Sequence, residues 1–228
     1  EGTTLRVISF NILYAGRKDH PWRDRREAAI AHLRDLAPDV FGVQEAEWSQ
    51  VQDLADAFPD YAAIGRGRDD GLTAGEAMAI YYRRDRFVLQ SAETFWLSDT
   101  PEVPGSNTWG AACNRTATIA ILTDRANGKP LGVCNTHLDH VSANAREKGS
   151  ALIRKRLAAY GGDLAWVVTG DFNSQPGSKP YENLVGVSAG LTLEDTFVES
   201  DPFSPLGIST FHGYAGEPRA NSRIDWVL

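Results

Sequence analysis

The chain has 228 residues, of which 42% are hydrophobic and 23% are charged, and a chain of this size and composition can fold around a sizeable core. No apolar run approaches the ~20 residues that a membrane-spanning helix needs, so no membrane span is expected. The formal net charge of −7 disfavours a protein that coats duplex DNA, because that mode of binding requires a broadly basic surface.

The cysteines and the start of the chain give little information on metal sites or on the cellular compartment. Cys113 and Cys134 lie in no CxxC or Cys/His array, so we expect neither a zinc site nor a disulfide framework. No segment resembles a signal peptide, and the chain begins with Glu1 rather than Met, as a processed or a trimmed protein would. The compartment, cytoplasmic or secreted, stays open.

The first quarter of the chain predicts two strand-helix units. Residues 5–12 and 39–45 have strand patterns that end on polar residues. Residues 23–36 and 48–58 carry apolar side chains at helical spacing. Two successive strand-loop-helix units favour a layered α/β arrangement.

The middle of the chain predicts short strands and two long polar loops. Residues 65–75 are rich in glycine, and residues 99–112 contain Pro, Gly, Ser and Asn, so both read as loops. The expected strands are 61–64, a hairpin of 77–82 with 87–91, a separate piece at 95–98, and a hairpin of 115–123 with 130–136 across an Asn-Gly turn.

The last third predicts a helix, a buried strand and several short pieces. Asn144 and Glu147 have capping-box spacing and open a helix that runs to about residue 160, where Gly161-Gly162 stops it. An apolar strand, 164–168, leads into Gly170-Asp171-Phe172-Asn173. A short helix at 180–185 and strand-like pieces at 194–198, 209–214 and 223–228 follow. No repeat or linker interrupts residues 1–228, so one domain is expected.

Polar side chains gather at the ends of five predicted strands. They are Asn11, Glu45, His137, the pair Asp171 and Asn173, and Asp225. Any one of these could belong to a turn, and Gly-Asp-x-Asn alone is more often a turn than a site. In layered α/β proteins, however, ligands bind where strand ends converge. Five such ends therefore predict one shared site.

The residue types at these strand ends are chemically coherent. Carboxylates such as Glu45 and Asp225, without thiolates, suit Mg²⁺ or Mn²⁺. Asp171 can accept a proton from an attacking water, while Asn173, Asn11 and His137 can donate to phosphoryl oxygens as charge builds. The predicted chemistry is metal-assisted phosphoester hydrolysis.

Five segments in this order resemble the endonuclease/exonuclease/phosphatase superfamily, which includes DNase I-like nucleases, abasic-site endonucleases, deadenylases, sphingomyelinases and inositol-phosphate phosphatases. The segments are Ser9-Phe10-Asn11, Pro38-Asp39-Val40 leading to Gln44-Glu45, Asn135-Thr136-His137-Leu138, Gly170-Asp171-Phe172-Asn173 and Ser222-Arg223-Ile224-Asp225. The resemblance implies a four-layer α/β sandwich in which two mixed β-sheets pack face to face with helices outside. The segments around 67–71, 95–98, 135–140 and 170–181 look like a largely uncharacterised bacterial subgroup.

The resemblance also implies roles for single residues. Glu45 is the principal metal ligand, with Asn11 and Asp225 nearby. Asp171 orients or deprotonates the attacking water, and Asn173 and His137 stabilise the phosphoryl transition state. Arg115 faces the phosphate. For His140 a supporting role is as plausible as direct substrate contact, and His212 is a candidate substrate-loop contact.

One departure from the family pattern is important. Relatives close the fold with a Ser-Asp-His segment after the Ile-Asp strand, and this chain, which stops at Leu228, contains no Ser-Asp-His. Either the natural end is missing, which we favour, or a catalytic residue has been lost. We expect these 228 residues to be weakly active or inactive and the complete protein to be a hydrolase.

The sequence thus predicts a Mg²⁺- or Mn²⁺-dependent phosphodiesterase, nuclease or phosphatase that acts as a monomer on nucleic acid or on a small phosphoester. The alternative is a non-catalytic binding module that keeps the fold. The sequence does not decide whether the protein is a nuclease or a small-molecule enzyme, whether it binds one metal ion or two, or what its physiological substrate is.

Overall fold

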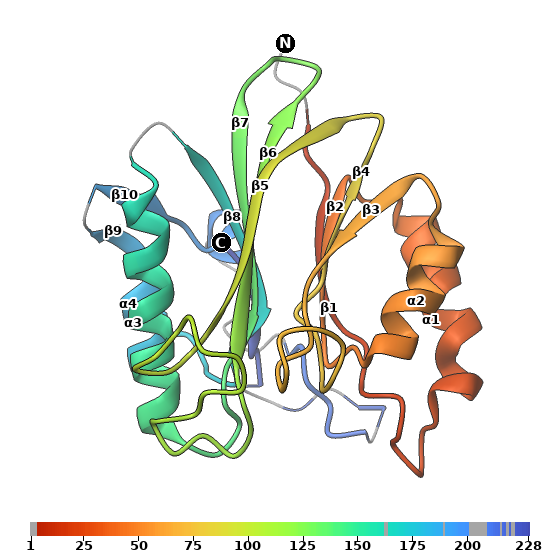
Figure 1. Cartoon of the computed structure of the whole chain (residues 1–228), viewed down its shortest axis with the longest axis horizontal. Helices are drawn as coiled ribbons and strands as arrows, with labels where there is room; N and C mark the ends of the chain where they lie inside the picture. Colours follow the sequence, from red (N-terminus) through yellow and green to blue (C-terminus); the bar gives the residue numbers. More distant parts are fainter. Residues whose placement is uncertain are drawn as a thin grey trace.

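In a computed structural model the described residues are 4–161, 164–188, 190–200, 209–214, 216–217, 219 and 222–228. Two β-sheets pack face to face in the middle of the molecule, and helices cover the outer face of each (Figure 1). The predicted four-layer α/β sandwich is therefore confirmed. Among the described helices, none is long and apolar enough to cross a membrane.

The first sheet comes from the N-terminal part of the chain. Its strands run in the order β1-β2-β4-β3, with β1 and β2 parallel and the other pairs antiparallel. The elements are β1 (Val7–Asn11), α1 (Trp22–Leu36), β2 (Val40–Gln44), α2 (Trp48–Ala57), β3 (Tyr61–Ile64) and β4 (Ile80–Arg83). Helices α1 and α2 cover its outer face (Figure 1).

The second sheet runs in the order β11-β8-β7-β6-β5, with only β7 and β8 parallel. Its strands are β5 (Phe87–Trp96), β6 (Thr116–Asp124), β7 (Pro130–His137), β8 (Ala165–Asp171) and β11 (Asp225–Val227). The remaining elements are α3 (Ala143–Ala159), α4 (Lys179–Leu184), the pair β9 (Gly186–Ser188) and β10 (Leu191–Leu193), and α5 (Thr196–Ser200). Helices α3 and α4 lie outside this sheet (Figure 1).

Three apolar clusters fill the three interfaces between the four layers. The first cluster, with Ile30 and Phe41, lies between α1, α2 and the first sheet. The second, with Tyr82 and Phe87, lies between the two sheets. The third, with Ile153, packs α3 on the second sheet. Strand β2 is buried along its whole length because both of its faces are covered.

A buried polar network joins the two sheets near the end that carries the candidate site. Asn135, with no exposed surface, donates from Nδ2 to the Val43 and Ala79 carbonyls and accepts from Gln44 Nε2 at 2.7 Å. The sheets approach closely here, since a Cβ on Gly42 would lie 2.6 Å from Asn135 Oδ1. The network fixes β2 and β4 against β7 and so fixes the spacing of their ends.

Four local predictions are wrong. Segments 77–82 and 87–91 do not form a hairpin, because β4 pairs with β2 and β3 while β5 pairs with β6. The expected separate strand at 95–98 does not form, because residues 95 and 96 are the end of the ten-residue β5 and residues 97 and 98 lie beyond it. Residues 196–200 are helical rather than extended. Segment 209–214 is not a strand.

The start of the helix in the last third also differs from the prediction. Ser142, not Asn144, caps α3, with its hydroxyl accepting from the Ala145 N–H at 3.2 Å. The other predicted strands and helices lie within a few residues of their predicted bounds, whereas the short strands β9 and β10 were not predicted.

Candidate active site

A pocket of about 910 Å³ opens where the ends of β1, β2, β7 and β8 and the start of β11 converge. These ends lie at the lower edge of the sandwich in Figure 1. All nine predicted site residues line it: Asn11, Glu45, Arg115, His137, His140, Asp171, Asn173, His212 and Asp225. The chain has five histidines, and every one of them lines this pocket.

The backbone turns sharply where two strands reach the pocket. Glu45, just after β2, has φ 61°, and Asn173, just after β8, has φ 46°. Side chains other than glycine rarely adopt this left-handed region, and such conformations cluster at ligand sites. Asn tolerates it better than most residues, whereas a Glu there carries a conformational cost. The cost at Glu45 is consistent with a carboxylate held in place for a purpose other than stability.

Asn11 connects two carboxylates at the floor of the pocket. Its Nδ2 donates to Glu45 Oε1 at 2.9 Å and to Asp171 Oδ2 at 3.0 Å. Its Oδ1 accepts from the Leu13 N–H at 3.0 Å, which fixes the orientation of the amide. The Tyr14 N–H approaches the other Glu45 oxygen at 3.3 Å. In this arrangement Asn11 positions the carboxylates and does not direct its own oxygen into the pocket.

Asn173 positions both Asp171 and His137. Its backbone N–H donates to Asp171 Oδ1 at 2.9 Å, and its Nδ2 donates to the Leu138 carbonyl at 2.9 Å and lies 3.0 Å from His137 Nε2. Because the Leu138 carbonyl can only accept, the amide nitrogen faces the imidazole and His137 Nε2 is the acceptor. Burial, followed by the charges of Arg115 and Arg68, lowers the pKa of His137 well below its usual range, so the ring is neutral.

Two carboxyl groups in the pocket hold protons unusually tightly. Burial raises the pKa of Asp171 to about 6, against the lowering effect of hydrogen bonds from Asn173 and Asn11. Burial and the Asp171 charge raise the pKa of Asp225 to about 7. The two residues face each other in the register of β11 on β8. Buried like charges of this kind favour either a shared proton or a bound cation.

One set of side chains in the pocket has the geometry of a metal site. Ligand atoms of Glu45, His137 and Asp171 all lie within 4.8 Å of one another. The carboxylates of Glu45 and Asp171 suit Mg²⁺ or Mn²⁺, whereas His137 Nε2 already accepts from Asn173. The raised pKa values of Asp171 and Asp225 fit the same reading, since a cation would relieve the repulsion. The donor set therefore fits a divalent cation.

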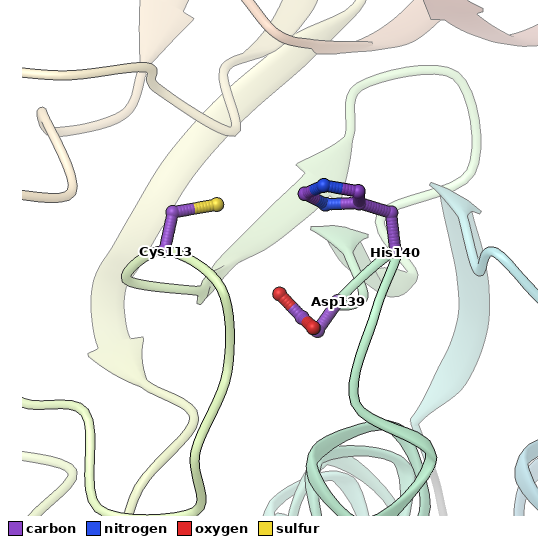
Figure 2. A group of neighbouring side chains, drawn as sticks. All are labelled: Cys113, Asp139 and His140. Carbon is purple, nitrogen blue, oxygen red and sulfur yellow. The ribbon is translucent and has the colours of Figure 1, made fainter.

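A second set, Cys113, Asp139 and His140, also lies within 4.8 Å (Figure 2). The guanidinium of Arg115, however, already binds two members of this set. It donates from Nε to Asp139 Oδ2 at 3.3 Å and from Nη2 to His140 Nδ1 at 2.8 Å. Asp139 also accepts three backbone N–H groups, from residues 112, 141 and 142. Asp139 thus has little capacity left for a metal, and the set anchors Arg115, which is 4% exposed.

Several residues that line the pocket were not predicted from the sequence. Arg68 and Glu76 form a largely buried ion pair at 2.6 Å in the pocket wall. Tyr214, another lining residue, stacks on His20 with ring centroids 5.8 Å apart and lies under the Arg17 guanidinium at 4.4 Å. No sequence signal marks these residues, because they lie in loops whose contacts are set by distant segments.

A sequence model of the Endonuclease/Exonuclease/phosphatase family matches residues 8–228. An endonuclease/exonuclease/phosphatase structure from Bacteroides vulgatus superposes with a TM-score of 0.89 at 33% identity, covering 99% of this chain and 87% of that one. A mannosyl-6-phosphatase from Bacteroides thetaiotaomicron superposes with a TM-score of 0.87 at 31% identity, covering 98% and 84%.

A curated relative, Nocturnin of Drosophila melanogaster, is 26% identical over 210 residues, which is 82% of this chain. The chain spans 31% of the length of that protein.

Proposed function

The chain belongs to the endonuclease/exonuclease/phosphatase family, and from that premise we propose that it is a phosphoester hydrolase that depends on a divalent metal ion. The observation that carries the proposal is the convergence of Asn11, Glu45, His137, Asp171 and Asp225 from five strand ends on one pocket. Proteins of this family hydrolyse phosphoesters and generally use divalent metals, and structures similar to this chain include a phosphatase.

Asp171 is the proposed proton acceptor for the attacking water. Its raised pKa makes it a stronger base than an ordinary carboxylate, and a carboxylate with a pKa of about 6 remains mostly ionised at neutral pH. Its two oxygens accept from the Asn173 backbone and the Asn11 amide, so the orientation of the carboxylate is fixed. A fixed, basic carboxylate is what in-line attack on phosphorus requires.

Glu45 is the proposed principal ligand of the metal ion, and Asp171 and Asp225 add negative charge beside it. When bound, Mg²⁺ or Mn²⁺ would neutralise a phosphoryl oxygen and lower the pKa of a coordinated water. Asn11 is assigned to the positioning of Glu45 and Asp171, because its amide nitrogen bridges them.

Arg115 and His140 are the proposed phosphate contacts. Arg115 is held on one edge by Asp139 and His140, so its guanidinium is preorganised before substrate arrives. Because His140 Nδ1 accepts from Arg115, the Nε2 atom of a neutral His140 ring carries the proton and can donate to a phosphoryl oxygen. Asn173 orients His137, and His212, which lines the pocket, is the proposed substrate-loop contact.

The test is hydrolysis of a substrate panel with and without metal. We expect Mn²⁺- or Mg²⁺-dependent release of product from at least one of bis(p-nitrophenyl) phosphate, single-stranded oligonucleotides, sugar phosphates or inositol phosphates, and none in EDTA. Preference within the panel separates a nuclease from a small-molecule enzyme. Hydrolysis that is equally fast in EDTA would reject the metal assignment, and tight phosphoester binding without turnover by the longest natural form of the protein would favour the binding module.

A further inference from the structure

A second pocket, of about 450 Å³, lies beside the candidate active site and shares Asn173 and Ile224 with it. Its other walls come from the first turns of α3, the loop after β8 and the start of α4. The residues are Ala143, Arg146, Glu147, Ser174, Gln175, Ser178, Lys179 and Pro180. The pocket does not include the residues assigned above to the metal or to water activation.

Two hydroxyl groups in this second pocket are buried without a hydrogen-bond partner among the described residues. They are the Oγ atoms of Ser174, which is 6% exposed, and of Ser178. Ser178 occupies the N-cap position of α4, where a serine normally bonds to the helix backbone, yet its side chain makes no cap hydrogen bond. A buried hydroxyl without a partner is costly, so two in one pocket indicate a ligand that accepts hydrogen bonds.

The charges around these hydroxyls favour an anion. Arg146, Lys179 and Glu147 are the charged residues that line the pocket, and Lys179 also pairs with Glu182 at 3.4 Å. Arg146 has no carboxylate partner among the described residues, so it is the positive charge available to a ligand. A group with several acceptor oxygens and negative charge, such as a phosphate, matches both the hydroxyls and the charges.

Asp139 fixes the position of one arginine in each pocket. Its carboxylate binds Arg115 of the candidate active site, and its backbone carbonyl accepts from Arg146 Nη1 at 2.9 Å. Both guanidinium groups are therefore held by a single buried residue. Such a pair suits two phosphate groups that lie next to each other in one molecule.

We propose that the second pocket binds a second phosphate of the substrate, adjacent to the phosphate that is hydrolysed. The proposal rests on the phosphoester hydrolase function given above. The neighbouring phosphate of a single-stranded nucleic acid and the second phosphate of a small bisphosphate share the same recognition chemistry. Ser174, Ser178 and Arg146 would donate to its oxygens.

The experiment compares ligands that carry one or two phosphates, by isothermal titration calorimetry in Mn²⁺. The pairs are TpT against TpTpT and glucose 1-phosphate against glucose 1,6-bisphosphate. All proteins carry Asp171→Asn to prevent turnover. We expect the ligand with two phosphates to bind about tenfold more tightly in at least one pair, because one or two hydrogen bonds to a charged group give about that factor.

The advantage of the second phosphate should disappear in the double variant Ser174→Ala/Ser178→Ala and in Arg146→Gln. Binding of the one-phosphate ligands should stay within twofold. Lys155→Gln, on the exposed part of α3 outside both pockets, is the matched control and should keep the advantage. An advantage confined to TpTpT assigns the pocket to nucleic acid, and one confined to the bisphosphate assigns it to a small molecule.

Thermal unfolding without ligand provides an independent check. Removing hydroxyls that have no partner should leave the melting temperature of the double serine variant unchanged or higher. A fall of several degrees would show that the hydroxyls stabilise the fold, and this would overturn the proposal. Equal affinity for the ligands with one and with two phosphates in both pairs would also overturn the proposal of a second phosphate site. The proposed hydrolase function would still stand if the unmodified protein hydrolysed a member of the substrate panel.

Discussion

Replacing Asp225 by Asn should stabilise the metal-free protein at alkaline pH. The pKa of Asp225 is raised from 3.8 to about 7, first by burial and then by the charge of Asp171. The folded state therefore binds a proton more tightly than the unfolded chain does. The stabilisation from protonation is complete below a pH of about 4 and is lost as the pH rises through about 7.

The size of the effect follows from the shift in pKa. A difference of about 3 pKa units corresponds to about 4 kcal/mol at pH 8. Part of this energy is the repulsion between Asp225 and Asp171. Relaxation of the surrounding protein and entry of water reduce the energy of both charged residues. We therefore expect Asp225→Asn to gain about 2 kcal/mol at pH 8, or roughly 5 °C in melting temperature for a chain of this length. At pH 4 the gain should vanish.

The assay is thermal unfolding of both proteins in EDTA at pH values from 4 to 8, with 4 and 8 as the two limits that the prediction names. The difference between variant and wild type isolates Asp225 from the other titrating groups. Mn²⁺ at pH 8 should raise the melting temperature of the wild type more than that of the variant, because the ion relieves the same repulsion. A difference that is independent of pH, or a variant less stable at pH 8, would refute the reasoning.

Three further variants test the fold and the phosphate contacts. A Cβ on Gly42 would lie 2.3 Å from a side-chain oxygen of the facing sheet, so urea titration of Gly42→Ala should show a loss of about 1–3 kcal/mol. Arg223→Met leaves the buried carboxylate of Asp195 without its ion-pair partner and should cost about 3–5 kcal/mol by the same measurement, most of it recovered when Asp195→Leu is added. His140→Ala, an exposed change that removes one partner of Arg115, should raise KM about three- to tenfold with little change in kcat, and an unchanged KM would exclude the contact.

The layered fold was predictable from the sequence because the apolar residues of each helix or strand recur at one main spacing, that of a helix or that of a strand. The exception at β4 and β5 has a simple physical cause. Tyr82 and Phe87 alternate as they would in a hairpin, but they belong to different sheets and pack in the same cluster between them. A strand pattern reports which side chains are buried and not which strand lies alongside. The connection between the sheets is fixed by Arg86, which binds Asp39, just before β2 of one sheet, and Asp124, at the end of β6 of the other.

The helical segment 196–200 illustrates a different limit of sequence prediction. Asp195 just before it is committed to a buried ion pair with Arg223, and its Oδ1 accepts from the Phe197 N–H. These contacts start a short helix in a sequence with strand propensity. Local propensity is weak enough for two such contacts to override it.

The candidate site was predictable to the extent that it lies at strand ends. Asn11 and Asp171 are the last residues of their strands and Glu45 directly follows its strand, so predicting the strands brings them together. Arg68 and Tyr214 lie in loops, and their places depend on distant contacts, such as the bond from Trp96 Nε1 to the Arg68 carbonyl and the stacking of Tyr214. Sequence periodicity carries no information on such contacts.

The central claim is that Asp171 drives a metal-dependent hydrolysis. The most direct measurement is the rate of bis(p-nitrophenyl) phosphate hydrolysis in Mn²⁺ by the wild type, by Asp171→Asn and by Asp56→Asn, an exposed carboxylate of α2 outside the pocket. We predict a Mn²⁺-dependent rate above background for the wild type and for Asp56→Asn, even if it is slow, and a fall of about 10²–10⁴-fold for Asp171→Asn. Equal rates for all three proteins would contradict the account.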